Sequence, residues 1–112
     1  MSGLGRWVLY RLAGLALLPL IVLHLWAWHA PGAPPTAFAP ARARLETTSA
    51  MAVALLLLSL TIFHGLTGLG NVLGDWWRLD RPGERRLAVA LGTAGVLLWI
   101  LGAWGLFAFR RR

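Results

Sequence analysis

The sequence predicts an all-α integral membrane protein with three transmembrane helices. Hydrophobic residues make up 58% of its 112 residues, and the mean hydropathy is +0.66, which is too apolar for an ordinary soluble domain of this size. These residues gather in three runs, each with about the 20 residues that cross a bilayer as a helix. Lipid requires helices there, because every backbone polar group must find its hydrogen bond within the segment.

The first predicted helix covers about residues 7–28 and contains Arg11 and Pro19. A basic start followed by an apolar run also fits a cleaved signal peptide, but this run is long and no small-residue cleavage site follows it. Residues 30–47 contain four prolines. We therefore expect an extended, aqueous connection there, without a strand or a long helix.

The second predicted helix covers about residues 48–73, and Thr47 or Thr48 can cap its start. A short charged turn at residues 76–86 contains a Pro-Gly pair, which is a turn signal. The third helix, about residues 87–109, should therefore lie antiparallel beside the second. The whole chain is one membrane domain whose helices run up, down and up, packing with a partner subunit.

The net charge of +7 comes from eleven arginines against four acidic residues. The arginines lie at the ends of the apolar runs, as interfacial anchors do, so we expect contact with membrane lipid and no binding of nucleic acid. Cysteine is absent, which excludes disulfides, Cys-ligated metal sites and a thiol nucleophile. With no soluble domain, the chain is expected to hold a group for partner chains and not to be catalytic alone.

The second helix ends in HGLTGLGNVLGDWW, residues 64–77, and a helix that only spans lipid needs neither its ionisable groups nor its glycines. His64, Gly68, Asn71 and Asp75 fall on one helical face. Neutral imidazole is a good iron ligand, and Gly68 removes bulk one turn above it, as a haem would require. Alternatively, the glycines let helices pack closely and His64 is a buried hydrogen-bonding residue.

Other polar and aromatic residues also have two interpretations. Asp75 and Trp76 fit a membrane interface or a quinone site, to which Trp76 offers its indole N–H or ring face. Arg11 either reaches the interface along its stem or pairs with an anion. That anion is a haem propionate or a group at the quinone site, where Arg11 could meet Asp75 and Trp76. By helix rise, His24 differs from His64 in depth by ~15 Å, so the two should not ligate one haem. His29 is interfacial, and we assign it no role.

The spacing H-x-x-x-G, with Asp eleven residues after the His and an aromatic residue next, resembles the membrane-anchor subunits of succinate dehydrogenase (respiratory complex II). Here it is formed by His64, Gly68, Asp75 and Trp76. The Arg11-Leu-Ala-Gly run and the three-helix layout are similar to the same family. The resemblance implies that two anchors share a b-type haem with His64 as an axial ligand to its iron. It also implies that Asp75 and Trp76 lie at a quinone site.

The same resemblance implies partners and a location. An iron–sulfur subunit and a flavoprotein subunit would dock near the quinone site, on the cytoplasmic side of a prokaryotic plasma membrane. The N-terminus and the 76–86 turn would lie on that side. The sequence leaves two other functions open: a small structural or assembly protein without a cofactor, and a subunit of another haem b quinol-oxidising complex.

The sequence departs from the family pattern at two places. Trp76 stands where the family has tyrosine, so proton donation to quinone by a phenol is not expected. Leu69, Gly70 and Asn71 replace the Ile-Arg-His run that follows the motif glycine in the larger, cytochrome b anchor. This difference favours the smaller, hydrophobic anchor subunit.

Overall fold

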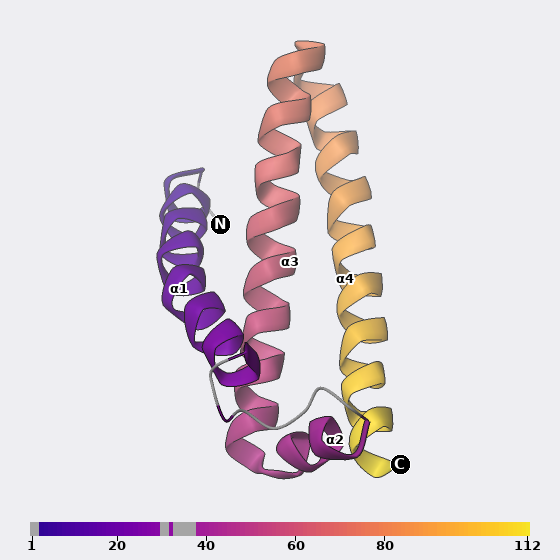
Figure 1. Ribbon diagram of the computed structural model, residues 1–112. Helices are drawn as coiled ribbons and strands as arrows, with labels where there is room; N and C mark the ends of the chain where they lie inside the picture. Colours follow the sequence, from indigo (N-terminus) through magenta and orange to yellow (C-terminus); the bar gives the residue numbers. More distant parts are fainter. Residues whose placement is uncertain (1–2, 30–31, 33–37) are drawn as a thin grey trace.

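A computed structural model describes residues 3–29, 32 and 38–112. Within these residues all regular structure is helical (Figure 1). Three of the helices are long and apolar enough to cross a membrane, which confirms the predicted all-α, three-span fold. The helices are α1 (Gly3–His29), α2 (Phe38–Glu46), α3 (Thr48–Trp77) and α4 (Arg81–Arg111).

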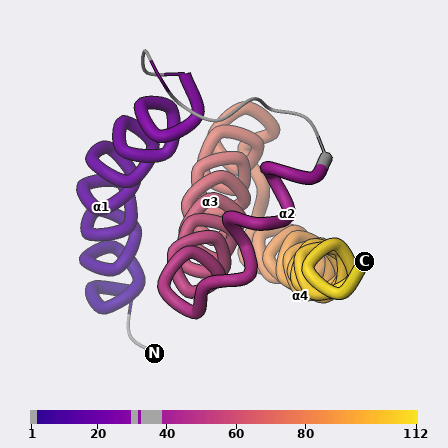
Figure 2. Tube along the Cα trace, turned by 60° about the horizontal axis from the view of Figure 1, so that its bottom comes forward, coloured from indigo at the N-terminus to yellow at the C-terminus, as the bar shows by residue number. Residues whose placement is uncertain are grey.

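The central helix of the structure is α3. It contacts α1 on one side and α4 on the other, while over the described residues no Cα atom of α1 lies within 8 Å of one in α4. Figures 1 and 2 both show α3 between its two neighbours. The chain runs along α1, returns along α3 and reverses again along α4, and at the α3–α4 turn these two helices extend past the start of α1 (Figure 1).

Local backbone chemistry fixes both ends of α3. The Thr47 side chain accepts a hydrogen bond from the Ala50 backbone N–H at 3.3 Å, so the predicted cap is confirmed at Thr47. At the other end, Arg78 adopts the left-handed conformation with φ 47° and ψ 50°. Its N–H bonds to the carbonyl oxygen of Gly74, which closes the last turn of the helix.

The turn between α3 and α4 is shorter than the predicted residues 76–86, and it does not lie at the Pro-Gly pair. The chain reverses at residues 78–80, and Pro82 lies in the first turn of α4. Asp80 caps that helix by accepting from the Gly83 backbone N–H at 2.9 Å. Proline fits there because the first N–H groups of a helix have no intrahelical partner anyway. Because Asp80 caps the helix, the Pro82-Gly83 pair lies in the first turn of α4 and not in the loop.

The connection after α1 is not wholly extended, because its second half forms α2 (Phe38–Glu46). Pro40 lies in the first turn of this helix, where proline is tolerated. The short helix packs on both α3 and α4. Arg110 donates to the Glu46 carbonyl oxygen at 2.9 Å, and Arg42 Nε donates to the Arg110 carbonyl oxygen at 3.3 Å. The other prolines predicted to extend the connection, Pro31, Pro34 and Pro35, lie outside the described residues.

Leucines opposite glycines bring α3 and α4 together. A Cβ atom added at Gly95 would lie 2.9 Å from Leu66 Cδ1, and one added at Gly102 would lie 2.9 Å from Leu58 Cδ1. Such small residues allow close approach in lipid, where dispersion contacts replace the hydrophobic effect as the driving force. The Trp99 indole N–H adds a hydrogen bond to Ser59 Oγ at 2.8 Å.

Filling this seam should destabilise the helix pair. We expect Gly95→Leu to lower the free energy of unfolding by about 1–3 kcal/mol, the usual cost of overpacking. Thermal unfolding of the detergent-solubilised protein measures the loss. Gly92→Leu on the same helix is the matched control, because no atom lies within 4 Å of a Cβ added there. Equal melting temperatures for the two variants would contradict the seam.

Candidate functional site

The His64 side chain extends from the middle of α3 toward α1. Its Nδ1 lies 3.2 Å from the backbone carbonyl oxygen of Tyr10. The imidazole also stacks on the Tyr10 phenol ring, with centroids 4.5 Å apart and 5° between the planes. A carbonyl oxygen can only accept, so Nδ1 carries the proton and donates, and the lone pair of the neutral ring lies on Nε2.

Gly14 makes this approach possible. A Cβ atom added at Gly14 would lie 3.3 Å from His64 Nδ1 and 2.8 Å from Cε1, and the second distance is closer than such atoms pack. Gly14 stands one helical turn after Tyr10, so its missing side chain uncovers the carbonyl that His64 reaches.

Gly68 has a related role on α3. A Cβ atom added there would lie 3.2 Å from the Tyr10 hydroxyl oxygen. The space that the sequence assigned to a haem above Gly68 is thus taken by Tyr10. The two glycines, one on each helix, leave room for one stacked pair of rings.

The Nε2 atom of His64 is open. It makes no hydrogen bond within the described residues, and no unpaired side-chain nitrogen or oxygen there is buried. The imidazole borders an open pocket of about 500 Å³, lined by Tyr10, Arg11, Gly14, Leu15 and His64. In metal-binding histidines one ring nitrogen binds the metal, and the other commonly donates to a carbonyl or carboxylate, which fixes the tautomer. The Nδ1 of His64 makes such a bond, and its Nε2 is available.

The chemistry of the surroundings limits which metal His64 could hold. No group of three or more His, Cys, Asp or Glu side chains in the described part of the chain could hold a metal ion. A bare ion at His64 would therefore have fewer than three such ligands from the described residues. A haem brings its own equatorial ligands and asks the protein only for axial ones, so a lone imidazole with a free Nε2 fits that group.

Arg11 lies beside His64 and not at the hairpin end of α3. It lines the same pocket as His64, and its guanidinium carbon lies 5.0 Å from the Trp7 ring centroid, a cation–π contact. The side chain is solvent-accessible, so its N–H donors remain available to an anion near the pocket.

Among the described residues no hydrogen bond or ion pair joins Arg11 to Asp75 or Trp76, the residues with which the sequence grouped it. The Tyr10 hydroxyl, one residue from Arg11, lies over Gly68, and Asp75 follows Gly68 by seven residues, about 10 Å of helix. The end of α3 extends past the start of α1 (Figure 1). Asp75 is exposed, and Trp76 is 80% exposed.

His24 lies elsewhere, as its predicted depth requires. It follows Gly14 by ten residues, about 15 Å along α1, and its ring lies 6.2 Å from that of Trp28. Arg44 covers the Trp28 ring at 4.5 Å. His29 is exposed at the end of α1. Neither of these histidines belongs to the His64 pocket.

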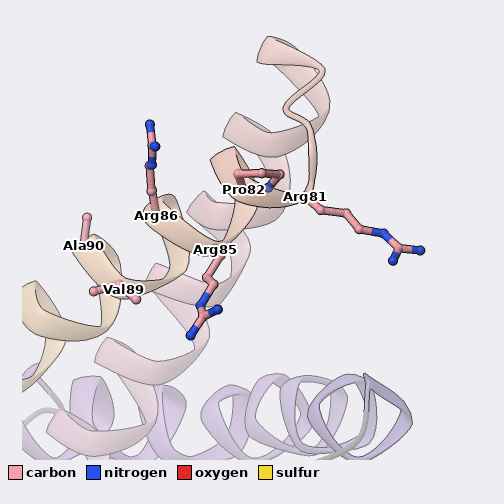
Figure 3. Close-up of a pocket in the computed structure, with 6 residues that line it drawn as sticks. All are labelled: Arg81, Pro82, Arg85, Arg86, Val89 and Ala90. Atoms are coloured by element: carbon pink, nitrogen blue, oxygen red, sulfur yellow. The ribbon is translucent and has the colours of Figure 1, made fainter.

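A second, larger pocket of about 650 Å³ lies at the start of α4 (Figure 3). Its arginine side chains extend in different directions (Figure 3), and none forms an ion pair with a described residue. The pocket has no histidine. It presents unpaired positive charge at the α3–α4 turn. Its lining residues are Arg81, Pro82, Arg85, Arg86, Val89 and Ala90.

Two residues of the His64 site, Tyr10 and Gly14, were not among the candidates drawn from the sequence. The run Tyr-Arg-Leu-Ala-Gly contains both, at a spacing of one helical turn. That spacing is the available signal, because a glycine four residues after any residue can uncover its carbonyl.

A family model described as succinate dehydrogenase/fumarate reductase transmembrane subunit matches residues 2–102. The chain belongs to this family. The match covers α1 to α3 and most of α4, so it includes both helices that form the His64 site, and it confirms the resemblance seen in the sequence. No curated protein and no solved structure matched the chain.

The register of α1 on α3 can be tested by cross-linking, since the chain has no native cysteine. We expect Tyr10→Cys combined with Gly68→Cys to be joined by a short bifunctional maleimide. The control pair His24→Cys and Gly68→Cys should not be joined, because His24 lies several turns away along α1. Electrophoresis of the chain after internal cleavage between the two helices reads the result. Equal linkage of both pairs would contradict the observed register.

Proposed function

We propose that the chain is a membrane-anchor subunit of a succinate:quinone oxidoreductase and that His64 is an axial ligand of a b-type haem. The observation that supports the proposal is the hydrogen bonding of the two imidazole nitrogens of His64. Its Nδ1 is held by the Tyr10 carbonyl at 3.2 Å, and its Nε2 is unpaired at an open pocket. Bound haem would supply a one-electron donor and acceptor within the membrane.

The same geometry supports a second anchor subunit as partner. The pocket is one-sided, with walls from α1 and α3 alone. His24 and His29 lie too far along α1 to supply the other axial ligand, so it would come from the partner. Few of the described residues are buried, and many large apolar side chains face outward, including Leu15 and Leu18 at 70% and 69% exposure. Lipid and partner helices would cover them.

Arg11 is proposed to neutralise negative charge at the haem. Its guanidinium lines the pocket beside His64 and is accessible. Haem propionates are carboxylates, and arginine binds carboxylates with a planar fork of donors. The contact with Trp7 keeps the guanidinium at this end of α1.

Asp75 and Trp76 are proposed to contribute to a quinone site near the α3–α4 turn. Trp76 can offer an indole N–H and a flat apolar face, and Asp75 can orient a donor or relay protons through water. Both are exposed, so the remaining walls of the site would come from partner chains. Arg11 is not assigned to this site, because the neighbouring Tyr10 lies over Gly68, about two helical turns before Asp75.

We also propose that the α3–α4 turn faces the soluble subunits, an iron–sulfur protein and a flavoprotein. The turn carries unpaired arginines that could meet an acidic protein surface. Quinone reduction needs electrons from that direction, so the docking face and the quinone site would share one end of the membrane domain. In a prokaryotic plasma membrane this end is cytoplasmic, and the N-terminus lies on the same side.

Replacing the proposed ligand should remove the haem. We expect His64→Ala to abolish or strongly reduce the b-type bands in the reduced-minus-oxidised spectrum of the purified complex. His24→Ala should leave those bands in place, since His24 lies outside the pocket. A wild-type haem content with an unchanged reduction potential in His64→Ala would exclude His64 as the ligand.

The quinone site predicts a separation of two activities. We expect Trp76→Leu to slow quinone reduction by roughly 2- to 10-fold, as the loss of one hydrogen bond of about 0.5–1.5 kcal/mol implies. Succinate oxidation by an artificial dye that takes electrons upstream should be spared. Trp104→Leu is the control, because Trp104 is similarly exposed at 69% but lies near the other end of α4. Unchanged quinone turnover and inhibitor sensitivity in both Trp76→Leu and Asp75→Asn would place the site wholly on partner chains.

A further inference from the structure

We propose that Tyr10 and Gly14 form a positioning device that sets the orientation and electron donation of His64. Tyr10 acts through its backbone carbonyl and its ring, and Gly14 acts by leaving the carbonyl uncovered. This inference rests on the proposed role of His64 as a haem ligand. It assigns a function to two residues of α1 that do not bind the metal themselves.

The main chain supplies the hydrogen-bond acceptor for His64. In a regular helix the Tyr10 carbonyl accepts from the N–H four residues on, which is that of Gly14. A carbonyl oxygen has a second lone pair, and His64 Nδ1 uses it from 3.2 Å away. Because this acceptor belongs to the backbone, it cannot rotate away from the ring.

The Tyr10 side chain fixes the plane of the imidazole. The rings are nearly parallel, with 5° between their planes and 4.5 Å between centroids. Gly68 lies beneath the phenol hydroxyl, where an added Cβ atom would make a tight contact at 3.2 Å. A hydrogen bond alone would allow the imidazole to turn about the Nδ1–oxygen line, and the stack prevents this turn. The hydrogen bond and the stack together therefore fix the direction in which the Nε2 lone pair points.

The consequence for a bound haem concerns its reduction potential. A hydrogen bond from Nδ1–H to a carbonyl raises the basicity of the imidazole and its donation to a metal. Stronger donation stabilises ferric over ferrous iron, so the hydrogen bond lowers the potential. Weakening that hydrogen bond should raise the potential.

Gly14→Ala tests the carbonyl part of the device. The added Cβ would lie 2.8 Å from His64 Cε1, and the imidazole must shift, which lengthens the bond to Tyr10. We expect the midpoint potential of the haem in the purified complex to move positive. We also expect roughly 10-fold weaker haem retention, as is typical when a hydrogen bond to a metal ligand is lost. The control is Gly92→Ala in α4, where an added Cβ meets no atom within 4 Å.

Substitutions at Tyr10 test the ring separately, because they leave the carbonyl in place. We expect Tyr10→Phe to keep the wild-type low-spin ferric signal in electron paramagnetic resonance, since it retains the stack. Tyr10→Leu should shift or broaden that signal by freeing the imidazole plane. A merely structural Tyr10 would change complex yield and leave the signal unmoved. If Gly14→Ala does not assemble, the Phe and Leu variants decide the test.

The outcomes separate this inference from the proposed function. Loss of haem in His64→Ala, together with wild-type potentials and signals in Gly14→Ala and Tyr10→Leu, would overturn the positioning device alone. Retention of haem in His64→Ala would overturn the proposed ligand and the device with it. A positive shift in Gly14→Ala and a wild-type potential in Gly92→Ala would support both.

Discussion

The hydrogen bond from His64 to the Tyr10 carbonyl joins α3 to α1 beside Gly14, which has no side chain. Residue 14 must be glycine for the imidazole to reach that oxygen, since a Cβ would lie 2.8 Å from the ring. The bond sets the register of α1 on α3. The register in turn places the phenol ring on the imidazole, Arg11 at the pocket and the Nε2 atom in the open. The site therefore depends on a backbone contact as much as on its side chains.

The two sides of α3 are joined to their neighbours by different chemistry. Toward α4, leucines of α3 lie against glycines, and one indole–hydroxyl hydrogen bond crosses the interface. Toward α1, the contact is an aromatic stack between two glycines and a bond to a carbonyl. The first interface is mostly apolar and has one polar contact. The second contains a titratable ring at membrane depth. Burying such a group in the membrane costs free energy, and ionisable residues at this depth generally have a function. The proposed function follows from that difference.

The sequence predicted the three spans because hydropathy and length decide them almost alone. It made the second turn too long because Pro82 and Gly83 are turn residues by composition, whereas they lie in the first turn of α4 after the Asp80 cap. Likewise, Pro40 did not prevent α2. His64 could be chosen as a site residue because an ionisable group at depth is rare in any helix. Tyr10 and Gly14 were missed, because their four-residue spacing shows only that a carbonyl can be uncovered. Which side chain reaches that carbonyl depends on the register between two helices.

The position of α3 between helices that do not contact each other has a consequence for biosynthesis. The ribosome makes α1 first, yet the helix against which α1 packs follows only after residues 30–47. During that interval the Tyr10 carbonyl is uncovered and Arg11 has no neighbour from α3. The later pair, α3 and α4, is joined by a turn of three residues and can associate as soon as both have left the ribosome. The α1–α3 interface can therefore form only after α3 has been made, and until then the His64 site lacks its histidine.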